Sequence, residues 1–263
     1  MRQIQAVGKD TVTVQPGVVI GDLNRHLKAH GQLFGPDPAT RNVTTVGGTL
    51  AMNTSGSHWV RYGAPRETIM RLQMVLSTGE VVEFDSQENA TISKTFPSLR
   101  AQLLAGRVRR VISSNEELIA EQRPQVMQNQ AGYNLFDVQQ NGHTDLTRLL
   151  VGSEGTLGII TAACLKLFPK PADIQTSFVA VHDQHAAVDL LARARRITDD
   201  RVVTFEYMQR ESIEFALQHI ADTRDPMQTT YKHYVMMELA AGEGSAAGLR
   251  EMMEAVLGEG MKE

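Results

Sequence analysis

Residues 44–56 read Thr-Thr-Val-Gly-Gly-Thr-Leu-Ala-Met-Asn-Thr-Ser-Gly, and this stretch decides how the fold is interpreted. Together with Gly-Pro-Asp-Pro at residues 35–38, it gathers glycine, proline, asparagine and threonine with few charges. This composition predicts an extended loop over residues 32–58. Because Gly47 and Gly48 lack side chains, their backbone N–H groups could approach a ligand and form a nest for a pyrophosphate. Composition alone equally allows a tight surface loop.

A second glycine-rich stretch, Val-Gly-Ser-Glu-Gly-Thr-Leu-Gly-Ile-Ile-Thr, occupies residues 151–161. It lacks the lysine that a phosphate-binding P-loop requires after its last glycine. It also differs from the dinucleotide fingerprint, because an apolar strand rather than a helix follows it. Taken alone, it predicts a turn that enters a buried strand.

Composition excludes several classes of protein. The chain has 263 residues, 42% of them hydrophobic, and a net charge of −4, which is typical of a globular protein and gives no basic face for nucleic acid. The single cysteine, Cys164, allows no internal disulfide. No apolar run reaches the length of a membrane span and no secretory leader is recognisable, so a soluble cytoplasmic protein is expected. No residue pattern predicts a metal site.

Hydrophobic patterning predicts a mixed α+β fold in two parts. The part over residues 1–170 has two hairpins, two helices and one long strand, and the part over residues 171–263 alternates strand and helix after Pro169-Lys170-Pro171. The elements expected are strands at 2–7, 11–14, 69–76, 81–84 and 157–168, helices at 22–30 and 98–121, a polar insertion at 85–97, then strands at 176–182, 202–208 and 232–240 with helices at 185–197, 210–221 and 245–257.

The two glycine stretches can be interpreted together with the motifs around them. These motifs are Val-Gln-Pro-Gly at 14–17, Gly-Pro-Asp-Pro at 35–38, Thr-Val-Gly-Gly at 45–48 with Asn53 and Ser55-Gly56, Arg-Tyr-Gly at 61–63, Ala-Gly-Tyr-Asn-Leu at 131–135 and the stretch 151–161. In this order, the sequence resembles the FAD-binding PCMH-type (vanillyl-alcohol-oxidase-like) flavoproteins. Within them it is most similar to the FAD-linked D-2-hydroxyacid dehydrogenases of the D-lactate, glycolate and D-2-hydroxyglutarate types.

The resemblance implies a cofactor, a reaction and roles for particular residues. The cofactor is FAD, and the reaction is hydride transfer from a small D-2-hydroxyacid to the flavin, with an iron–sulfur or quinone-linked electron acceptor. Residues 171–263 correspond to part of a ferredoxin-like cap domain, and no catalytic base is assigned. Tyr133 and Asn134 are expected on the substrate side. The residues implied to bind the cofactor are Pro36, Asp37, Thr45, Val46, Gly47, Gly48, Asn53, Ser55, Gly56, Glu154, Gly155, Gly158 and Ile159.

The sequence also departs from the family pattern. The first FAD-binding lobe does not precede Met1, and the cap motifs with the substrate-binding arginine and the histidines do not occur before Glu263. These departures predict a fragment that binds FAD weakly by itself, located in the cytoplasm or at the inner face of the membrane. Two alternatives stay open. One is a flavoenzyme like UDP-N-acetylenolpyruvoylglucosamine reductase, and the other is a non-catalytic remnant or assembly subunit.

Overall fold

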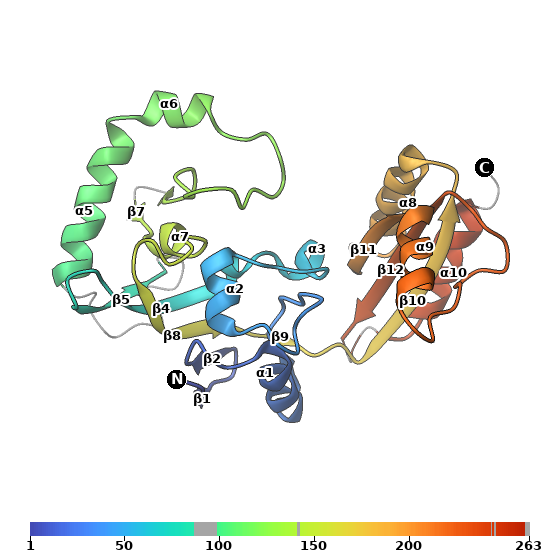
Figure 1. The fold of residues 1–263 in the computed structure, drawn as a ribbon, viewed down its shortest axis with the longest axis horizontal. Helices are drawn as coiled ribbons and strands as arrows, with labels where there is room; N and C mark the ends of the chain where they lie inside the picture. Colours follow the sequence, from blue (N-terminus) through green and yellow to red (C-terminus); the bar gives the residue numbers. More distant parts are fainter. Residues whose placement is uncertain (87–98, 141–142, 243, 245, 261–263) are drawn as a thin grey trace. The chain divides into compact units, whose positions relative to one another are not determined.

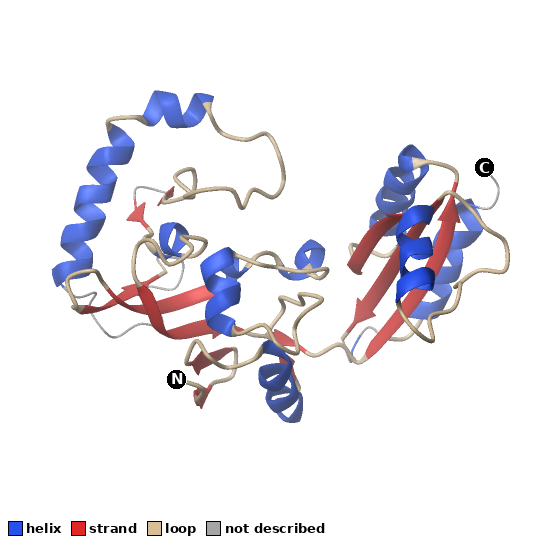
Figure 2. Ribbon diagram, viewed as in Figure 1, coloured by secondary structure: helices blue, strands red, loops and turns tan. Residues whose placement is uncertain are grey.

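The computed structural model describes residues 1–86, 99–140, 143–242, 244 and 246–260. The chain folds into two compact units. The first comprises Met1–Gly56 with Gly63–Phe168, and the second comprises Ser57–Tyr62 with Pro169–Glu263. Each unit contains both helices and strands (Figure 2), so the predicted α+β class is confirmed. The domain boundary at residue 170 stays a prediction.

A five-stranded antiparallel sheet organises the first unit (Figure 1). Both predicted hairpins are confirmed, because neighbouring strands of each pair directly. The strand that follows the second glycine stretch lies between the two hairpins and joins them into one sheet. The order across the sheet is β1 (Ile4–Val7), β2 (Thr11–Val14), β8 (Ile159–Lys166), β4 (Ile69–Val75) and β5 (Val81–Asp85).

Several helices supply apolar residues to the same core as this sheet. In α1 (Ile20–Leu27), Leu23 and Leu27 share one face and are completely buried, as their spacing predicts. Gly31 ends the following 3₁₀ turn in the left-handed region with a φ of 65°. The other elements of this unit are α2 (Val46–Met52), α4 (Pro65–Thr68), α5 (Leu99–Ser113), α6 (Glu116–Glu121), α7 (Thr147–Leu150), β3 (Gln32–Leu33), β6 (Gln139–Gln140) and β7 (His143–Thr144). The strand β9 (Phe168–Pro169) begins in this unit and ends in the next.

Two predictions for this unit were wrong in part. The expected loop over residues 32–58 contains the helix α2, because Val46 and Leu50 supply a fully buried face that outweighs the glycine pair. The single helix expected over 98–121 is two helices, since the chain turns at Asn115, whose side chain donates to the Val111 carbonyl at 2.7 Å. The predicted polar insertion at 85–97 lies mostly outside the described residues.

The second unit is a three-stranded antiparallel sheet with the order β10 (Asp173–Val181), β12 (His233–Ala241) and β11 (Val202–Gln209). Its helices are α3 (Trp59–Tyr62), α8 (Gln184–Ile197), α9 (Arg210–His219) and α10 (Leu249–Gly260). Alternate residues of the central strand β12 are completely buried and form one core with residues of α8 and α10. The alternating strands and helices predicted after Pro171 are confirmed. No helix in the described parts of either unit is long and apolar enough to cross a membrane.

We expect Gly56→Ala to lower the free energy of unfolding by roughly 2–4 kcal/mol, because it combines backbone strain with a steric clash. Gly56 has a φ of 74°, and a Cβ there would lie 2.1 Å from the Asp37 carbonyl oxygen. Gly79→Ala is the matched control, since Gly79 has a similar φ of 82° with no atom within 4 Å. Urea unfolding followed by circular dichroism should show a loss of about 1 kcal/mol for the control. Equal losses would contradict the steric argument.

The acid stability of the second unit should depend on Asp225. The backbone N–H of Met227 and the guanidinium of Arg210, 2.6 Å away, hold the pKa of this carboxyl below its usual range. Its contribution to stability is therefore present above the unfolded-state pKa, about 4, and is lost as the pH falls through the lower folded-state pKa. We expect Asp225→Asn to destabilise at pH 7 and to lose less stability than the parent protein on acidification to about pH 3.

The measurement is urea unfolding followed by the fluorescence of Trp59, the single tryptophan, which belongs to this unit. Asp189→Asn, an exposed carboxyl on α8, is the control and should leave the pH dependence unchanged. A parallel pH profile for parent and Asp225→Asn would show that the ion pair does not contribute.

Candidate functional site

The first glycine stretch begins helix α2 with a side-chain cap. Thr45 has extended backbone dihedral angles, and its Oγ1 accepts a hydrogen bond from the Gly48 N–H at 3.2 Å. At the other end, Asn53 adopts the left-handed conformation with a φ of 52° and terminates the helix. The threonine before the glycine pair and the asparagine after it therefore set the bounds of α2.

The backbone amides at the start of α2 do not form the predicted anion nest. The N–H groups of Val46 and Gly47 donate to the carbonyls of Val18 and Pro16, both at 2.8 Å, and Gly48 donates to Thr45. These donors are already satisfied within the fold. Gly47 is needed for another reason, since a Cβ there would lie 2.5 Å from the Pro16 Cβ. The absence of its side chain allows the helix to pack against the Pro16-Gly17 turn.

The second glycine stretch is hydrogen-bonded to α2. The N–H of Gly152 donates to the Leu50 carbonyl at 2.9 Å, and the N–H of Glu154 donates to the Ala51 carbonyl at 3.0 Å. Both donors lie in residues with positive φ, at 86° for Gly152 and 53° for Glu154. The turn thus adds donors to carbonyl groups at the end of α2, where the Leu50 carbonyl also accepts from the Asn53 N–H at 3.3 Å. As a result, segments about a hundred residues apart in sequence become neighbours.

These two segments line a shared cavity of about 340 Å³ in the first unit. This volume falls within the range of small-molecule sites, about 300–1,000 Å³. The described residues that line it include no charged side chain and five glycines. The lining residues are Pro16, Gly17, Thr45, Gly47, Gly48, Ala51, Ser153, Gly155, Gly158, Ile159 and Ile160.

The lining fits a flat, largely apolar ring system better than an isolated anion. A Cβ on Gly155 would meet no atom within 4 Å, so the backbone there stands open to a ligand. Ile159, at the start of β8, keeps 65% of its surface exposed beside the cavity. An exposed isoleucine next to bare main chain offers an apolar surface on which a ring can lie. The residues present therefore fit part of a flavin nucleotide.

The structure brings together only some of the residues assigned by resemblance. Those that line the cavity are Thr45, Gly47, Gly48, Gly155, Gly158 and Ile159. Those that do not line it are Pro36, Asp37, Val46, Asn53, Ser55, Gly56 and Glu154. Their cofactor-binding roles stay predictions.

Several residues outside the cavity have structural contacts that explain their place in the motif. The Val46 side chain is completely buried in the core. The Asn53 side chain accepts a hydrogen bond from the Arg66 N–H at 2.9 Å, and Ser55 Oγ accepts one from Gln128 at 2.8 Å. Asp37 forms an ion pair with Arg41 at 2.8 Å. Each of these three polar side chains thus has a partner within the fold.

Sequence reasoning missed five of the lining residues, namely Pro16, Gly17, Ala51, Ser153 and Ile160. Pro16 and Gly17 belong to a motif that carries the family resemblance, so that motif was the available signal. Ala51 follows from the helical nature of α2, since it lies one turn after Gly47 and Gly48. This helical periodicity was missed because a loop was predicted for these residues.

The structure places the two residues expected on the substrate side, Tyr133 and Asn134, in different surroundings. Tyr133 is 45% exposed, and its hydroxyl lies 2.7 Å from Thr156 Oγ1 in the second glycine stretch. Asn134 is only 7% exposed and lines a different, more polar pocket. Neighbouring residues therefore face different surroundings, and their roles toward a substrate stay predictions.

Comparison with known proteins gives a consistent result. Residues 1–85 match the sequence profile of the FAD binding domain family. The chain is 29% identical over 194 residues to glycolate oxidase subunit GlcD of Bacillus subtilis (strain 168), covering 73% of this chain and 31% of that protein. It is 31% identical over 163 residues to D-lactate dehydrogenase of Anaerostipes hadrus, covering 62% and 24%. The D-2-hydroxyglutarate dehydrogenase of Haemophilus influenzae (strain ATCC 51907 / DSM 11121 / KW20 / Rd) is 31% identical over 166 residues, covering 61% and 16%.

The predicted resemblance to the FAD-linked dehydrogenases is confirmed. The matched family likewise supports FAD as the cofactor. A solved structure of alkyldihydroxyacetonephosphate synthase superposes with a TM-score of 0.64 at 17% identity, covering 99% of this chain and 41% of that one, which supports the fold alone. The chain spans about a third or less of the length of the relatives named above.

The cap of α2 can be tested by Thr45→Ala. We expect this variant to lose about 1 kcal/mol of the free energy of unfolding, because the Gly48 N–H loses its acceptor. Thr45→Ser keeps a hydroxyl at the same place and should lie close to the parent protein in urea unfolding. If the serine and alanine variants were equally destabilised, the contribution would come from the threonine methyl group instead of the cap.

Proposed function

We propose that this chain forms part of an FAD-dependent oxidoreductase that oxidises a small D-2-hydroxyacid such as D-lactate or glycolate. The observation that carries the proposal is the cavity in which the two glycine stretches meet, since its main-chain walls fit a flavin nucleotide. The similarity to glycolate oxidase, D-lactate and D-2-hydroxyglutarate dehydrogenases supports the substrate class.

The residues of this chain have binding and positioning roles in the proposed reaction. When bound, FAD supplies the acceptor for a hydride from the hydroxyl-bearing carbon of the substrate. Thr45, Gly48 and Gly155 would hold the cofactor along bare main chain, and Ile159 would cover an apolar part of it. The hydrogen bond between Tyr133 and Thr156 would fix the nearby edge of the site.

The remaining features of the proposal concern the complete protein. Because the chain spans a minor part of its relatives, the electron acceptor is a proposal from the resemblance, namely an iron–sulfur or quinone-linked partner. The proposed location is the cytoplasm, with peripheral association at the inner membrane face. The residue that removes the hydroxyl proton is not assigned among the residues of this chain.

Filling the cavity should weaken FAD binding. Ala51 lines the cavity and Met52, the next residue of α2, is 51% exposed outside it. We expect Ala51→Phe to raise the dissociation constant for FAD by about tenfold or more, because the phenyl ring takes space that the ligand needs. Met52→Phe adds a phenyl ring on the same helix and should leave the constant unchanged. Quenching of flavin fluorescence on titration measures both, and equal constants would place FAD elsewhere.

The substrate class can be tested by spectroscopy on the flavin-loaded protein. After FAD titration, D-lactate, glycolate or D-2-hydroxyglutarate is added without oxygen and the visible absorbance is followed. Bleaching by a hydroxyacid supports the proposal. Bleaching only by a reduced nicotinamide cofactor would favour the enolpyruvyl-sugar reductase alternative, and no flavin spectrum at all would favour a non-catalytic remnant.

A further inference from the structure

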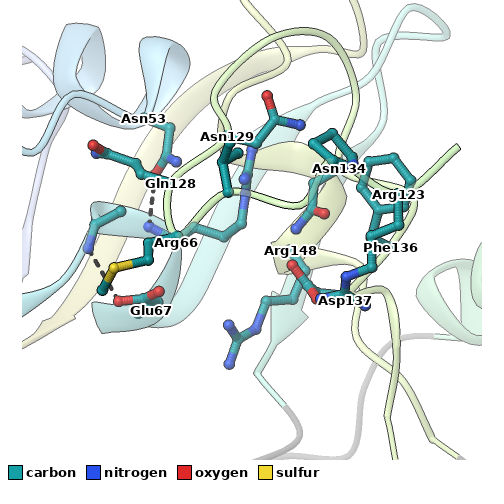
Figure 3. A pocket seen from close by; sticks show the side chains of 14 residues that line it. Asn53, Arg66, Glu67, Arg123, Gln128, Asn129, Asn134, Phe136, Asp137 and Arg148 are labelled. Atoms are coloured by element: carbon teal, nitrogen blue, oxygen red, sulfur yellow. Dashed lines mark hydrogen bonds and ion pairs between the residues drawn. The ribbon is translucent and has the colours of Figure 1, made fainter.

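A second pocket in the first unit, of about 120 Å³, shares no lining residue with the cavity described above (Figure 3). It lies at the opposite end of α2, where Asn53 terminates the helix. In contrast to the apolar main-chain cavity, it is lined by the charged and amide side chains labelled in Figure 3. Three of them, Arg66, Arg148 and Asn134, are hydrogen-bond donors that are largely buried.

Arg66 is a buried cation whose hydrogen bonds go to a neutral group. The residue is 8% exposed, and its Nε and Nη2 donate to the Val151 carbonyl at 3.3 and 3.0 Å. Within the described part of the chain, these two bonds leave Nη1 as a remaining donor. Burial lowers the pKa of Arg66, the negative charge of Asp137 raises it, and the positive charge of Arg148 lowers it by a smaller amount. Both guanidinium groups line the same small pocket.

The carboxylates that line the pocket or lie beside it have partners within the fold. Asp137 accepts from Arg123 at 2.9 Å, and Glu67 accepts from the Ala64 N–H at 3.1 Å. Asp145 forms an ion pair with Arg148 at 3.8 Å and also accepts from Ser86 and from Thr147. The acidic groups thus balance charge near the pocket, while the described hydrogen bonds of the Arg66 guanidinium go to a carbonyl.

Asn134 adds a donor without an acceptor. Its residue is 7% exposed, and its Nδ2 is buried without a hydrogen-bond partner among the described residues. A buried amide N–H that lacks an acceptor destabilises the fold unless a ligand or water supplies one. This group lines the same pocket as the two arginines. An anionic acceptor would satisfy both the Asn134 donor and the positive charge of the arginines.

We infer that this pocket is a binding site for a small oxyanion, a carboxylate or a phosphate, held by Arg66, Arg148 and Asn134. The planar guanidinium groups suit either anion, because both present paired oxygens to two N–H groups. A buried water could accept from Asn134 but carries no charge to pair with the buried Arg66 guanidinium. The volume of about 120 Å³ limits the ligand, or the part of it that enters, to a few heavy atoms. The inference does not depend on flavin binding.

The test uses the ¹H–¹⁵N spectrum of the side-chain amides of the full chain. Sodium phosphate and sodium acetate are titrated separately at constant ionic strength set by sodium chloride. The Asn134 signal is identified by its absence in Asn134→Asp. We expect this signal to shift and saturate with at least one of the two anions, and the anion that saturates it identifies the ligand chemistry. A shift that stays linear with both anions would overturn the inference.

Variants distinguish anion binding in this pocket from a general effect of charge on the protein. Asn134→Asp replaces the donor with a negative charge of the same size and should weaken anion binding by about tenfold or more, measured on neighbouring backbone signals. Arg148→Gln should do the same and provides the test if the first variant does not fold. Asn115→Asp makes the same chemical change at an exposed position between α5 and α6 and should leave binding unchanged. Unaltered affinity in the folded pocket variants would also overturn the inference.

Discussion

Two backbone hydrogen bonds between α2 and the second glycine stretch are the constraint on which the first unit depends. The N–H groups of Gly152 and Glu154 donate to the carbonyls of Leu50 and Ala51. They join two segments that are far apart in sequence, and the strand β8 that follows then enters the centre of the sheet. This link brings together the two segments that line the apolar cavity. The position of the candidate site is thus a consequence of how the end of a short helix is satisfied.

The glycines of the two motifs serve packing as much as ligand approach. Gly47 allows contact with Pro16, and its N–H is already bonded to the Pro16 carbonyl. Gly155, in contrast, has positive φ and open space around it. A glycine-rich motif therefore mixes residues required by neighbouring backbone with residues that leave room for a ligand. Only the three-dimensional structure distinguishes them, because both kinds look identical in a sequence.

The sheet could be predicted well because its signals are local. Both hairpins have turn residues between β-branched runs, and the strands of the second unit alternate with amphipathic helices. The helix α2 could not be predicted from composition, because its stability comes from the burial of Val46 and Leu50 in a core formed by distant strands. The candidate site was predicted only in part, because it too depends on contacts between distant segments. The shared cavity follows from two motifs, but the lining by Ala51 depends on a helical turn that the local sequence does not indicate.

Gly152 connects the two pockets in a way that the sequence does not suggest. Its N–H binds the end of α2, and a Cβ at this residue would lie 2.6 Å from Arg66 Nη2. The missing side chain therefore lets a buried guanidinium approach the same turn that supports the apolar cavity. Asn53 contributes from the other side, because it ends α2 and accepts from the Arg66 N–H. A single helix end thus fixes both an apolar cavity and a cationic pocket, which explains why buried polar residues are concentrated at this point of the fold.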